Sequence, residues 1–141
     1  RGRERRPTVI VADTNIIAYL LLPSPFTGLA ERLYAQDPEW IAPTLWRSEF
    51  RNVLSLYVRR GLLTLGQAMA LQDEADDLMR GNAYDVVSAD VLSLASDSGC
   101  SAYDCEFVAL ARSVSVTLVT ADRRLAQAFP QYARTLEVAA G

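Results

Sequence analysis

Two residue types are missing from this 141-residue chain: it contains no histidine, and all fourteen of its basic residues are arginine. Without histidine, catalysis by a Ser-His-Asp or Cys-His arrangement is excluded, and so are metal sites built on imidazole. Without lysine, neither a P-loop nor a Schiff base is available. Any chemistry that this protein performs must therefore use carboxylates, hydroxyl groups, arginines or a bound metal ion.

Cysteines and long apolar runs are also scarce. Cys100 and Cys105 are too few for a disulfide framework or a zinc site, and we expect them to be small core residues in a reducing cytoplasm. The longest apolar run, residues 16–22, is far shorter than the roughly 20 residues that span a bilayer. The basic N-terminus is not followed by the apolar core of a signal peptide. We therefore expect a cytoplasmic protein without a membrane partner.

The composition and length of the chain are typical of a globular protein. Half of the residues are hydrophobic, and the length suits one domain with a substantial core. We expect residues 1–7 to be a disordered basic lead-in and residues 8–141 to form the domain. The net charge of −3 argues against a protein that coats itself in nucleic acid, although a local arginine patch would still bind it.

Short β-branched runs alternate with helical patterns along the chain. This alternation predicts an α/β fold, with a mostly parallel sheet of four to five strands and helices on both faces. The predicted strands are residues 8–12, 39–42, 84–87, 115–120 and 134–138.

Acidic residues follow strands or open helices at three places. Asp13 follows the first strand, Asp122 follows the run 115–120, and Asp104 lies at the mouth of a helix. Ligands of open α/β sheets collect outside the carboxyl ends of the strands, which makes these carboxylates candidates for a site. The alternative for Asp104 and Asp122 is that each merely caps its helix.

A fourth carboxylate lies on a helix that follows a strand. In the predicted helix 45–60, Glu49 falls within the apolar stripe that includes Trp46 and Phe50. An unpaired carboxylate near a core face costs several kcal/mol, so it requires a cation, a hydrogen-bond network or an edge position. The alternative is that Glu49 lies on the rim of the stripe and reaches water.

Four converging carboxylates with no lysine or histidine repel one another. Hard divalent cations with oxygen ligands, Mg²⁺ or Mn²⁺, relieve this repulsion, and two such ions balance four carboxylates in formal charge. A site of this kind suits in-line displacement at a phosphodiester.

Four segments, VADTN (11–15), SEFRNVL (48–54), SAYDCEFVALA (101–111) and LVTADRRLAQA (118–128), together resemble PIN-domain ribonucleases, most closely the VapC-type toxins of bacterial toxin–antitoxin pairs. The resemblance implies a Mg²⁺- or Mn²⁺-dependent endoribonuclease with Asp13, Glu49, Asp104 and Asp122 as its catalytic, metal-binding quartet. Asn15 and Thr120 match supporting polar neighbours of that site. Cys105 departs from the family pattern, in which alanine is commoner.

The resemblance also implies partners: an RNA substrate, a cognate antitoxin protein and a second copy of the chain. The predicted helices within 45–79 carry surplus apolar residues that we assign to the antitoxin and dimer surfaces, although all five would alternatively belong to the core. These residues are Leu56, Leu62, Leu63, Leu65 and Met69. Three arginines near the carboxylates in sequence are candidates for RNA contacts or ordinary solvated side chains: Arg112, Arg123 and Arg124.

Two other functions compete with the ribonuclease. A catalytically inactive PIN fold would serve as a protein-binding module, and an RNA cleavage assay with and without Mg²⁺ separates it from the enzyme. A phosphoacceptor receiver domain also has an α/β fold and an acidic Mg²⁺ pocket, but it requires a lysine near the pocket, and this chain has none.

Overall fold

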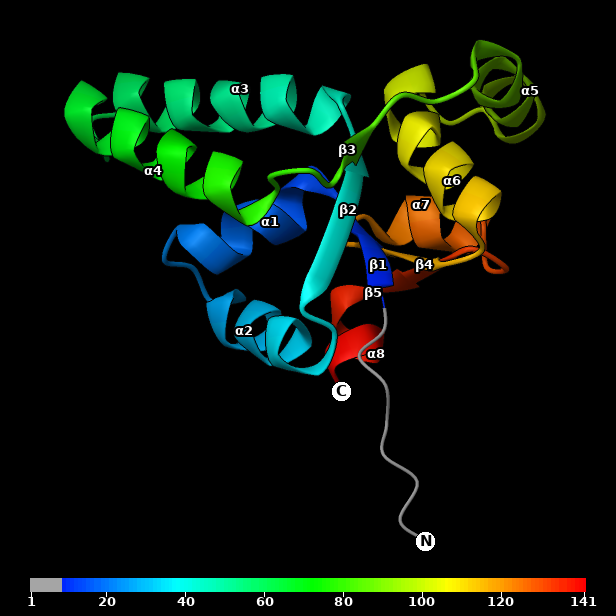
Figure 1. The fold of residues 1–141 in the computed structure, drawn as a ribbon, viewed down its shortest axis with the longest axis horizontal. Coiled ribbons are helices and arrows are strands. Elements are labelled where there is room, and N and C mark those ends of the chain that lie inside the picture. Colours follow the sequence, from blue (N-terminus) through cyan, green and yellow to red (C-terminus); the bar gives the residue numbers. More distant parts are fainter. Residues whose placement is uncertain (1–8) are drawn as a thin grey trace, which may run out of the picture.

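The computed structural model describes residues 9–141, and the structural statements below refer to them (Figure 1). The predicted basic lead-in, residues 1–7, lies outside the described residues, as does residue 8. The proposed domain boundary therefore stays a prediction.

A five-stranded parallel sheet forms the centre of the described chain, with the strand order β3-β2-β1-β4-β5. From the central strand β1 the chain first builds outward to β2 and β3, and then returns to the other side of β1 to add β4 and β5. This reversal between β1 and β4 is where open α/β sheets bind ligands. The strands are β1 (Val9–Ala12), β2 (Glu39–Pro43), β3 (Ala83–Tyr84), β4 (Thr117–Thr120) and β5 (Ala133–Thr135).

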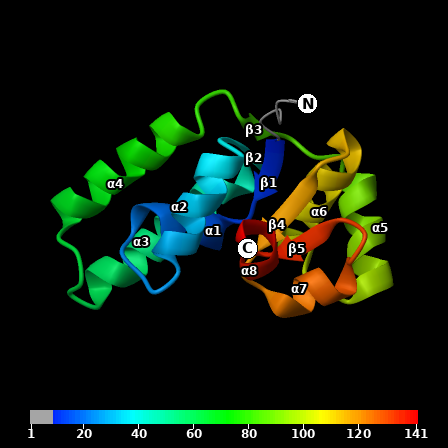
Figure 2. The ribbon, with the colours of Figure 1, turned by 90° about the horizontal axis from the view of Figure 1, so that it is seen from below.

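Helices connect successive strands and cover both faces of the sheet (Figures 1 and 2). Helices α5, α6 and α7 lie on one face, whereas α1, α2 and α8 lie on the other. Helices α3 and α4 form an antiparallel hairpin that projects beyond the sheet. The helices are α1 (Thr14–Leu21), α2 (Thr27–Gln36), α3 (Leu45–Arg59), α4 (Leu65–Leu78), α5 (Ser88–Ser98), α6 (Ala102–Val114), α7 (Arg123–Ala128) and α8 (Leu136–Ala140).

The core fills the space between the sheet and its two helical layers. Its largest fully buried side chains include Trp40 of β2, Phe50 of α3 and Phe107 of α6. Cys105 is buried and Cys100 half-buried, both as free thiols, as predicted for small core residues. Among residues 9–141, no helix has both the length and the apolar character needed to cross a membrane.

The prediction of a mostly parallel sheet with helices on both faces is confirmed, but the predicted ends of several strands were wrong. Only residues 83–84 pair with β2, and the chain after Tyr84 runs extended into α5. The predicted strand 134–138 is instead the short strand β5 followed by helix α8, because the Thr135 side chain accepts a hydrogen bond from the Val138 N–H and begins a helix. Ser115, predicted to open β4, ends α6 in a left-handed conformation with φ 58°.

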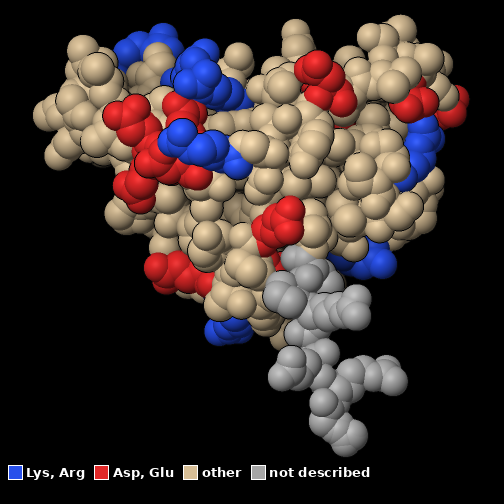
Figure 3. All heavy atoms as spheres, in the orientation of Figure 1, with Lys and Arg blue, Asp and Glu red and all other residues tan. Residues whose placement is uncertain are grey.

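Acidic side chains gather over the α3–α4 hairpin on the face shown in Figure 3, next to arginines. Arg47 of α3 makes a bidentate ion pair with Asp76 of α4, at 2.9 and 2.7 Å, which lowers the pKa of Asp76. Asp77 pairs with Arg80. The pair of Arg47 with Asp76 therefore joins the two helices of the hairpin, although ion pairs exposed to solvent contribute little to stability.

Candidate active site

The four predicted carboxylates line one pocket at the carboxyl ends of the central strands. Asp13 follows β1, Glu49 projects from α3, Asp104 lies in the first turn of α6, and Asp122 follows β4. The pocket has a volume of about 420 Å³. Segments more than a hundred residues apart in sequence are brought together because β1 and β4 are neighbours in the sheet.

Asp13 is the most buried of the four carboxylates, with 8% of its surface exposed. One oxygen accepts a hydrogen bond from the Thr14 N–H at 2.8 Å, which caps α1, and the other accepts one from the Thr120 hydroxyl at 2.7 Å. Thr120 has no exposed surface. Both oxygens of Asp13 are thus held in place by neutral donors.

Burial raises the pKa of Asp13 from 3.8 to about 6. The bonds from Thr120 and Thr14 act in the opposite direction, and the charges of Glu49 and Asp104 add to the rise. A carboxylate that loses water and receives only neutral donors is destabilised in its charged form. Without a cation, Asp13 therefore carries a proton far more readily than an exposed aspartate.

Glu49 is half-buried and is held across the pocket from Asp13. Its Oε1 accepts a hydrogen bond of 2.7 Å from the Thr14 hydroxyl, which joins α3 to the start of α1. Burial raises the pKa of Glu49, the bond from Thr14 opposes the rise, and the negative charges of Asp104 and Glu106 add to it. Glu49, on the apolar stripe of α3, therefore has a hydrogen-bond partner in Thr14.

Asp104 does not cap its helix. Ser101 is the N-cap of α6, and its hydroxyl accepts a hydrogen bond from the Asp104 N–H at 3.0 Å. The capping alternative for Asp104 is therefore wrong. Burial raises the pKa of Asp104, the charge of Asp122 adds to the rise, and a hydrogen bond between its carboxylate and the Ser101 side chain opposes it.

Asp122 does cap its helix, as the alternative for that residue predicted. Its Oδ1 accepts hydrogen bonds from the N–H groups of Arg124 and Leu125 at 2.9 and 3.2 Å. Its own N–H donates to the Thr120 hydroxyl at 3.0 Å, so Thr120 connects Asp122 to Asp13. A capping role and a place in the pocket are compatible, because the second carboxylate oxygen is not used by the cap.

The rest of the pocket wall is neutral. Asn15, predicted as a supporting residue, lines it, whereas Thr120 acts from beneath through Asp13. None of the described residues in the wall is an arginine. Arg112 pairs with Asp90 at 3.5 Å, and Arg123 lines a different depression.

Four pocket residues with hydrogen-bonding side chains were not predicted from the sequence. The signal for Thr14 was available, since a hydroxyl next to a carboxylate at a strand end is well placed to orient other polar groups. Ser48, Asn52 and Tyr103 had no such signal, because their position depends on how α3 and α6 pack. All four line the pocket: Thr14, Ser48, Asn52 and Tyr103.

The donor chemistry of the pocket fits a hard divalent cation, because carboxylate, hydroxyl and amide oxygens line it and three of its carboxylates have a raised pKa. Within residues 9–141, however, no group of three or more carboxylate or thiol side chains is arranged to hold an ion by itself. Mg²⁺ in proteins is commonly held by one or two carboxylates with water completing its shell, which this arrangement accommodates.

Comparison with known proteins identifies the family. The model of the PIN domain matches residues 10–129. Ribonuclease VapC3 of Pyrobaculum aerophilum is 34% identical over 124 residues, which cover 86% of this chain and 95% of that protein. The chain therefore belongs to the PIN-domain family, as its four sequence segments suggested, and its relative places it with the VapC-type members.

Two solved structures share the fold. PAE2754 from Pyrobaculum aerophilum superposes with a TM-score of 0.75 at 18% identity, over 96% of both chains. FitAcB from Neisseria gonorrhoeae superposes with a TM-score of 0.69 at 20% identity, over 91% of this chain and 98% of that one. The family model and the 34% identical relative thus identify this protein as a PIN-domain protein, and the two solved structures share its fold.

Proposed function

We propose that this protein is a Mg²⁺- or Mn²⁺-dependent endoribonuclease, the toxin of a toxin–antitoxin pair, acting in the cytoplasm. One observation carries the proposal: four carboxylates from four separate elements line a single pocket that has no basic side chain among its described wall residues. The 34% identity to a VapC ribonuclease supports RNA as the substrate class.

Asp13, Glu49, Asp104 and Asp122 hold the cation in this proposal, directly or through water. When bound, a divalent cation lowers the pKa of water and offsets the charge of the phosphate and the carboxylates. The raised pKa values of Asp13, Glu49 and Asp104 support this assignment, since such a cluster is strained unless protons or cations neutralise it.

The two threonines do the positioning. The Thr14 N–H and the Thr120 hydroxyl hold the two oxygens of Asp13, and the Thr14 hydroxyl holds one oxygen of Glu49, so both carboxylates have fixed orientations. The cap of α7 fixes Asp122 in the same way. Asn15, exposed at the edge of the pocket, is a neutral hydrogen-bond partner for the RNA or for a water molecule.

A cleavage assay on a structured RNA mixture tests the proposal. We expect fragments with internal cuts in Mg²⁺ or Mn²⁺, no cleavage in EDTA, and recovery when the metal is restored. A protein that binds partners but cleaves no RNA with either metal would instead be an inactive PIN-fold module. Sequencing the ends of RNA cut in cells then identifies the target.

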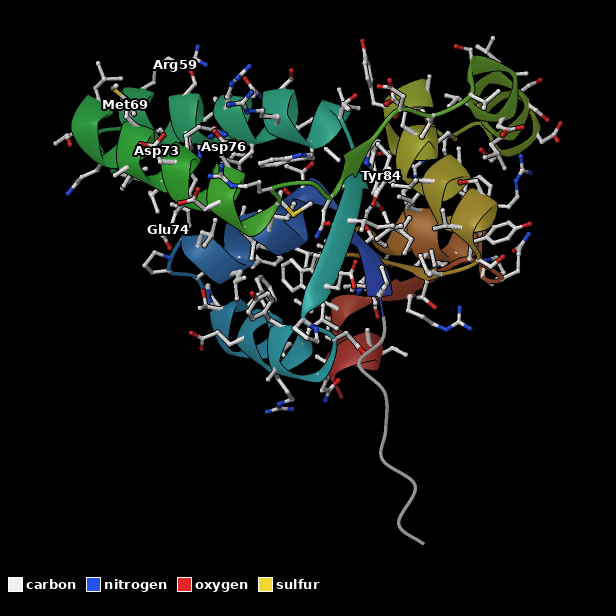
Figure 4. All side chains as sticks on the ribbon, in the orientation of Figure 1. Arg59, Met69, Asp73, Glu74, Asp76 and Tyr84 are labelled. Carbon is white, nitrogen blue, oxygen red and sulfur yellow. The ribbon has the colours of Figure 1, made fainter. Side chains whose placement is uncertain are left out.

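The α3–α4 hairpin is the proposed partner surface. Four of its surplus apolar residues are exposed, Leu62, Leu65 and Met69 by 60% or more and Leu56 by 37%, whereas Leu63 packs partly against the core. An apolar groove of about 360 Å³ runs between the two helices, and Arg59 and Met69 on its wall are labelled in Figure 4. Exposed apolar patches of this kind are typical of protein interfaces.

We assign part of this surface to a cognate antitoxin and part to a second copy of the chain. Co-expression with the small protein encoded beside it should yield a complex and suppress toxicity, and Met69→Asp should weaken that complex. Failure of the neighbouring protein to bind or to suppress toxicity contradicts the antitoxin assignment. Sedimentation at high concentration tests the dimer, and a persistent monomer contradicts it.

A further inference from the structure

Tyr103 is an exposed aromatic side chain at the wall of the carboxylate pocket. It lies in the first turn of α6, directly before Asp104, with 64% of its surface exposed. The residues of α6 from Phe107 to Ala111 are buried in the core. Only the first turn of α6 contributes residues to the pocket wall. Tyr103 therefore contributes little to the packing of the fold.

The negative charge of the pocket opposes the binding of RNA. Four carboxylates repel phosphate, and none of the described wall residues is an arginine that would attract it. A bound cation offsets this repulsion most strongly at the phosphate that it touches and less at neighbouring ones. Affinity for the neighbouring nucleotides must then come largely from uncharged contacts with the wall, and stacking of a base on an aromatic ring is such a contact for any base.

The wall formed by α3 suits the same role. Leu45 and Val53 are half-buried there, and Ser48 and Asn52 add neutral hydrogen-bonding groups. An aromatic ring from one helix and a mixed apolar and amide surface from another are the two types of contact that an unpaired base needs, one for its face and one for its edge.

We propose that Tyr103 is a stacking platform for an unpaired base next to the scissile phosphate, and that it makes the pocket selective for single-stranded segments. This inference rests on the proposed ribonuclease function for the identity of the ligand. Tyr103 binds the substrate and takes no part in bond breaking.

Equilibrium binding tests the platform separately from cleavage. The reference protein carries Glu49→Gln, which keeps the shape of the pocket and is expected to abolish cleavage. The probe is fluorescein-labelled single-stranded octaadenylate in Mg²⁺, measured by anisotropy. Adding Tyr103→Ala should raise Kd by about 5- to 150-fold, the usual effect of removing one base–aromatic stack, whereas Tyr103→Phe should stay within about 2-fold.

A substrate lacking one base makes the test specific for stacking. One abasic residue is moved through the octaadenylate, position by position. At one position, loss of the base should weaken binding to the Tyr103 protein by about as much as Tyr103→Ala does. In the Tyr103→Ala protein, the same abasic residue should have almost no further effect, because both changes remove the same contact.

Tyr84 supplies the matched control. It is an exposed tyrosine on β3, labelled in Figure 4, with 44% of its surface exposed, and it is not part of the pocket wall. Tyr84→Ala should leave Kd unchanged. Circular dichroism melts of each variant confirm that the fold is intact, as expected for changes at exposed side chains.

The outcomes distinguish the two proposals. Tyr103-dependent binding in a protein whose wild type cleaves no RNA supports the platform and overturns the ribonuclease. The platform alone is overturned if the wild type cleaves RNA but Tyr103→Ala leaves Kd unchanged. It is also overturned if the abasic residue changes Kd equally in the Tyr103 and Tyr103→Ala proteins. Absence of any octaadenylate binding by the reference protein also overturns the platform.

Discussion

Asp104 lies in the first turn of a helix that Ser101 caps, so its carboxylate is not needed as the N-cap of α6. Replacing it with asparagine removes one negative charge from the pocket and keeps the shape of the side chain. The folded protein without metal should be as stable as wild type or more stable, by on the order of 1 kcal/mol, because repulsion with Asp122 falls. Cleavage should fall by orders of magnitude, since an amide is a poor ligand for a hard cation.

Thermal melts with and without Mg²⁺, run beside the cleavage assay, check this prediction for Asp104. Mg²⁺ should raise the melting temperature of the wild type by binding only the folded state, and should raise that of Asp104→Asn less. Asp97→Asn, at an exposed position on α5, is the control and should behave as wild type. An active Asp104→Asn enzyme would contradict the proposed site.

The raised pKa of Asp13 predicts that the stability of the metal-free protein falls as the pH rises. Its pKa is 3.8 in the unfolded chain and about 6 in the metal-free fold, so the folded protein binds more protons than the unfolded chain between these values. The stabilisation from protonated Asp13 is complete below pH 3.8 and is lost as the pH rises through 6. This residue alone should lower the free energy of unfolding by on the order of 3 kcal/mol across that window.

Urea denaturation in EDTA between pH 4.5 and 7.5 measures the Asp13 effect. We expect stability to decrease as the pH rises, the decrease to shrink in Asp13→Asn, and Mg²⁺ to shrink it in the wild type by favouring the charged carboxylate. If the metal-free protein instead becomes steadily more stable from pH 4.5 to 7.5, the pKa of Asp13 in the folded protein is not raised.

At the scale of secondary structure elements, Thr120 joins the carboxyl end of β4 to two other elements. Its hydroxyl donates to Asp13 after β1 and accepts from the Asp122 N–H before α7. These two bonds position the carboxylate of Asp13 and the backbone of Asp122 relative to the sheet. A single buried hydroxyl thus determines the spacing of half of the quartet.

Thr120→Val keeps the volume of the side chain and removes both of these hydrogen bonds. We expect a loss of about 1–3 kcal/mol in unfolding free energy, because a buried carboxylate and an N–H lose their partner, and a higher pKa for Asp13. The Mg²⁺ concentration for half-maximal cleavage should rise. Thr120→Ser keeps the hydroxyl and should restore most of the metal affinity. If the valine and serine variants require the same Mg²⁺ concentration, Thr120 does not position the site.

At the scale of the whole molecule, charge limits how this protein binds RNA. The net charge is −3, and the pocket wall has no arginine among the described residues. We expect weak general affinity, a shallow dependence of log Kd on log salt, and selection of RNA by shape and unpaired bases.

Cleavage of a duplex and of a single strand of the same sequence tests this expectation, together with titrations at several salt concentrations. The single strand should be cut preferentially, and cuts in total RNA should concentrate at few sites. Equal degradation of every RNA at low enzyme concentration would contradict it.

The regular part of the fold was predictable because its signals are local. The β-branched runs of β1 and β4 and the apolar stripe of α3 identify buried elements without knowledge of their neighbours. The run at 84–87 and the tail at 134–138 were not predictable in the same way, since a run of a few residues forms a strand only where a partner strand lies beside it. In the first run only Tyr84 pairs with a partner strand, β2, and in the tail only Arg134 and Thr135 do, with β4.

The sequence by itself determined which chemistry is available. With no histidine or lysine, three carboxylates at strand ends and helix starts and a fourth on the apolar stripe of a helix point to a cation and a phosphodiester. Only the tertiary structure decided how these carboxylates behave. Burial of Asp13, the bond from Thr14 to Glu49 across 35 residues and the place of Tyr103 at the pocket wall all follow from packing between elements. A pKa depends on desolvation and on distances between charges, and neither exists until the chain has folded.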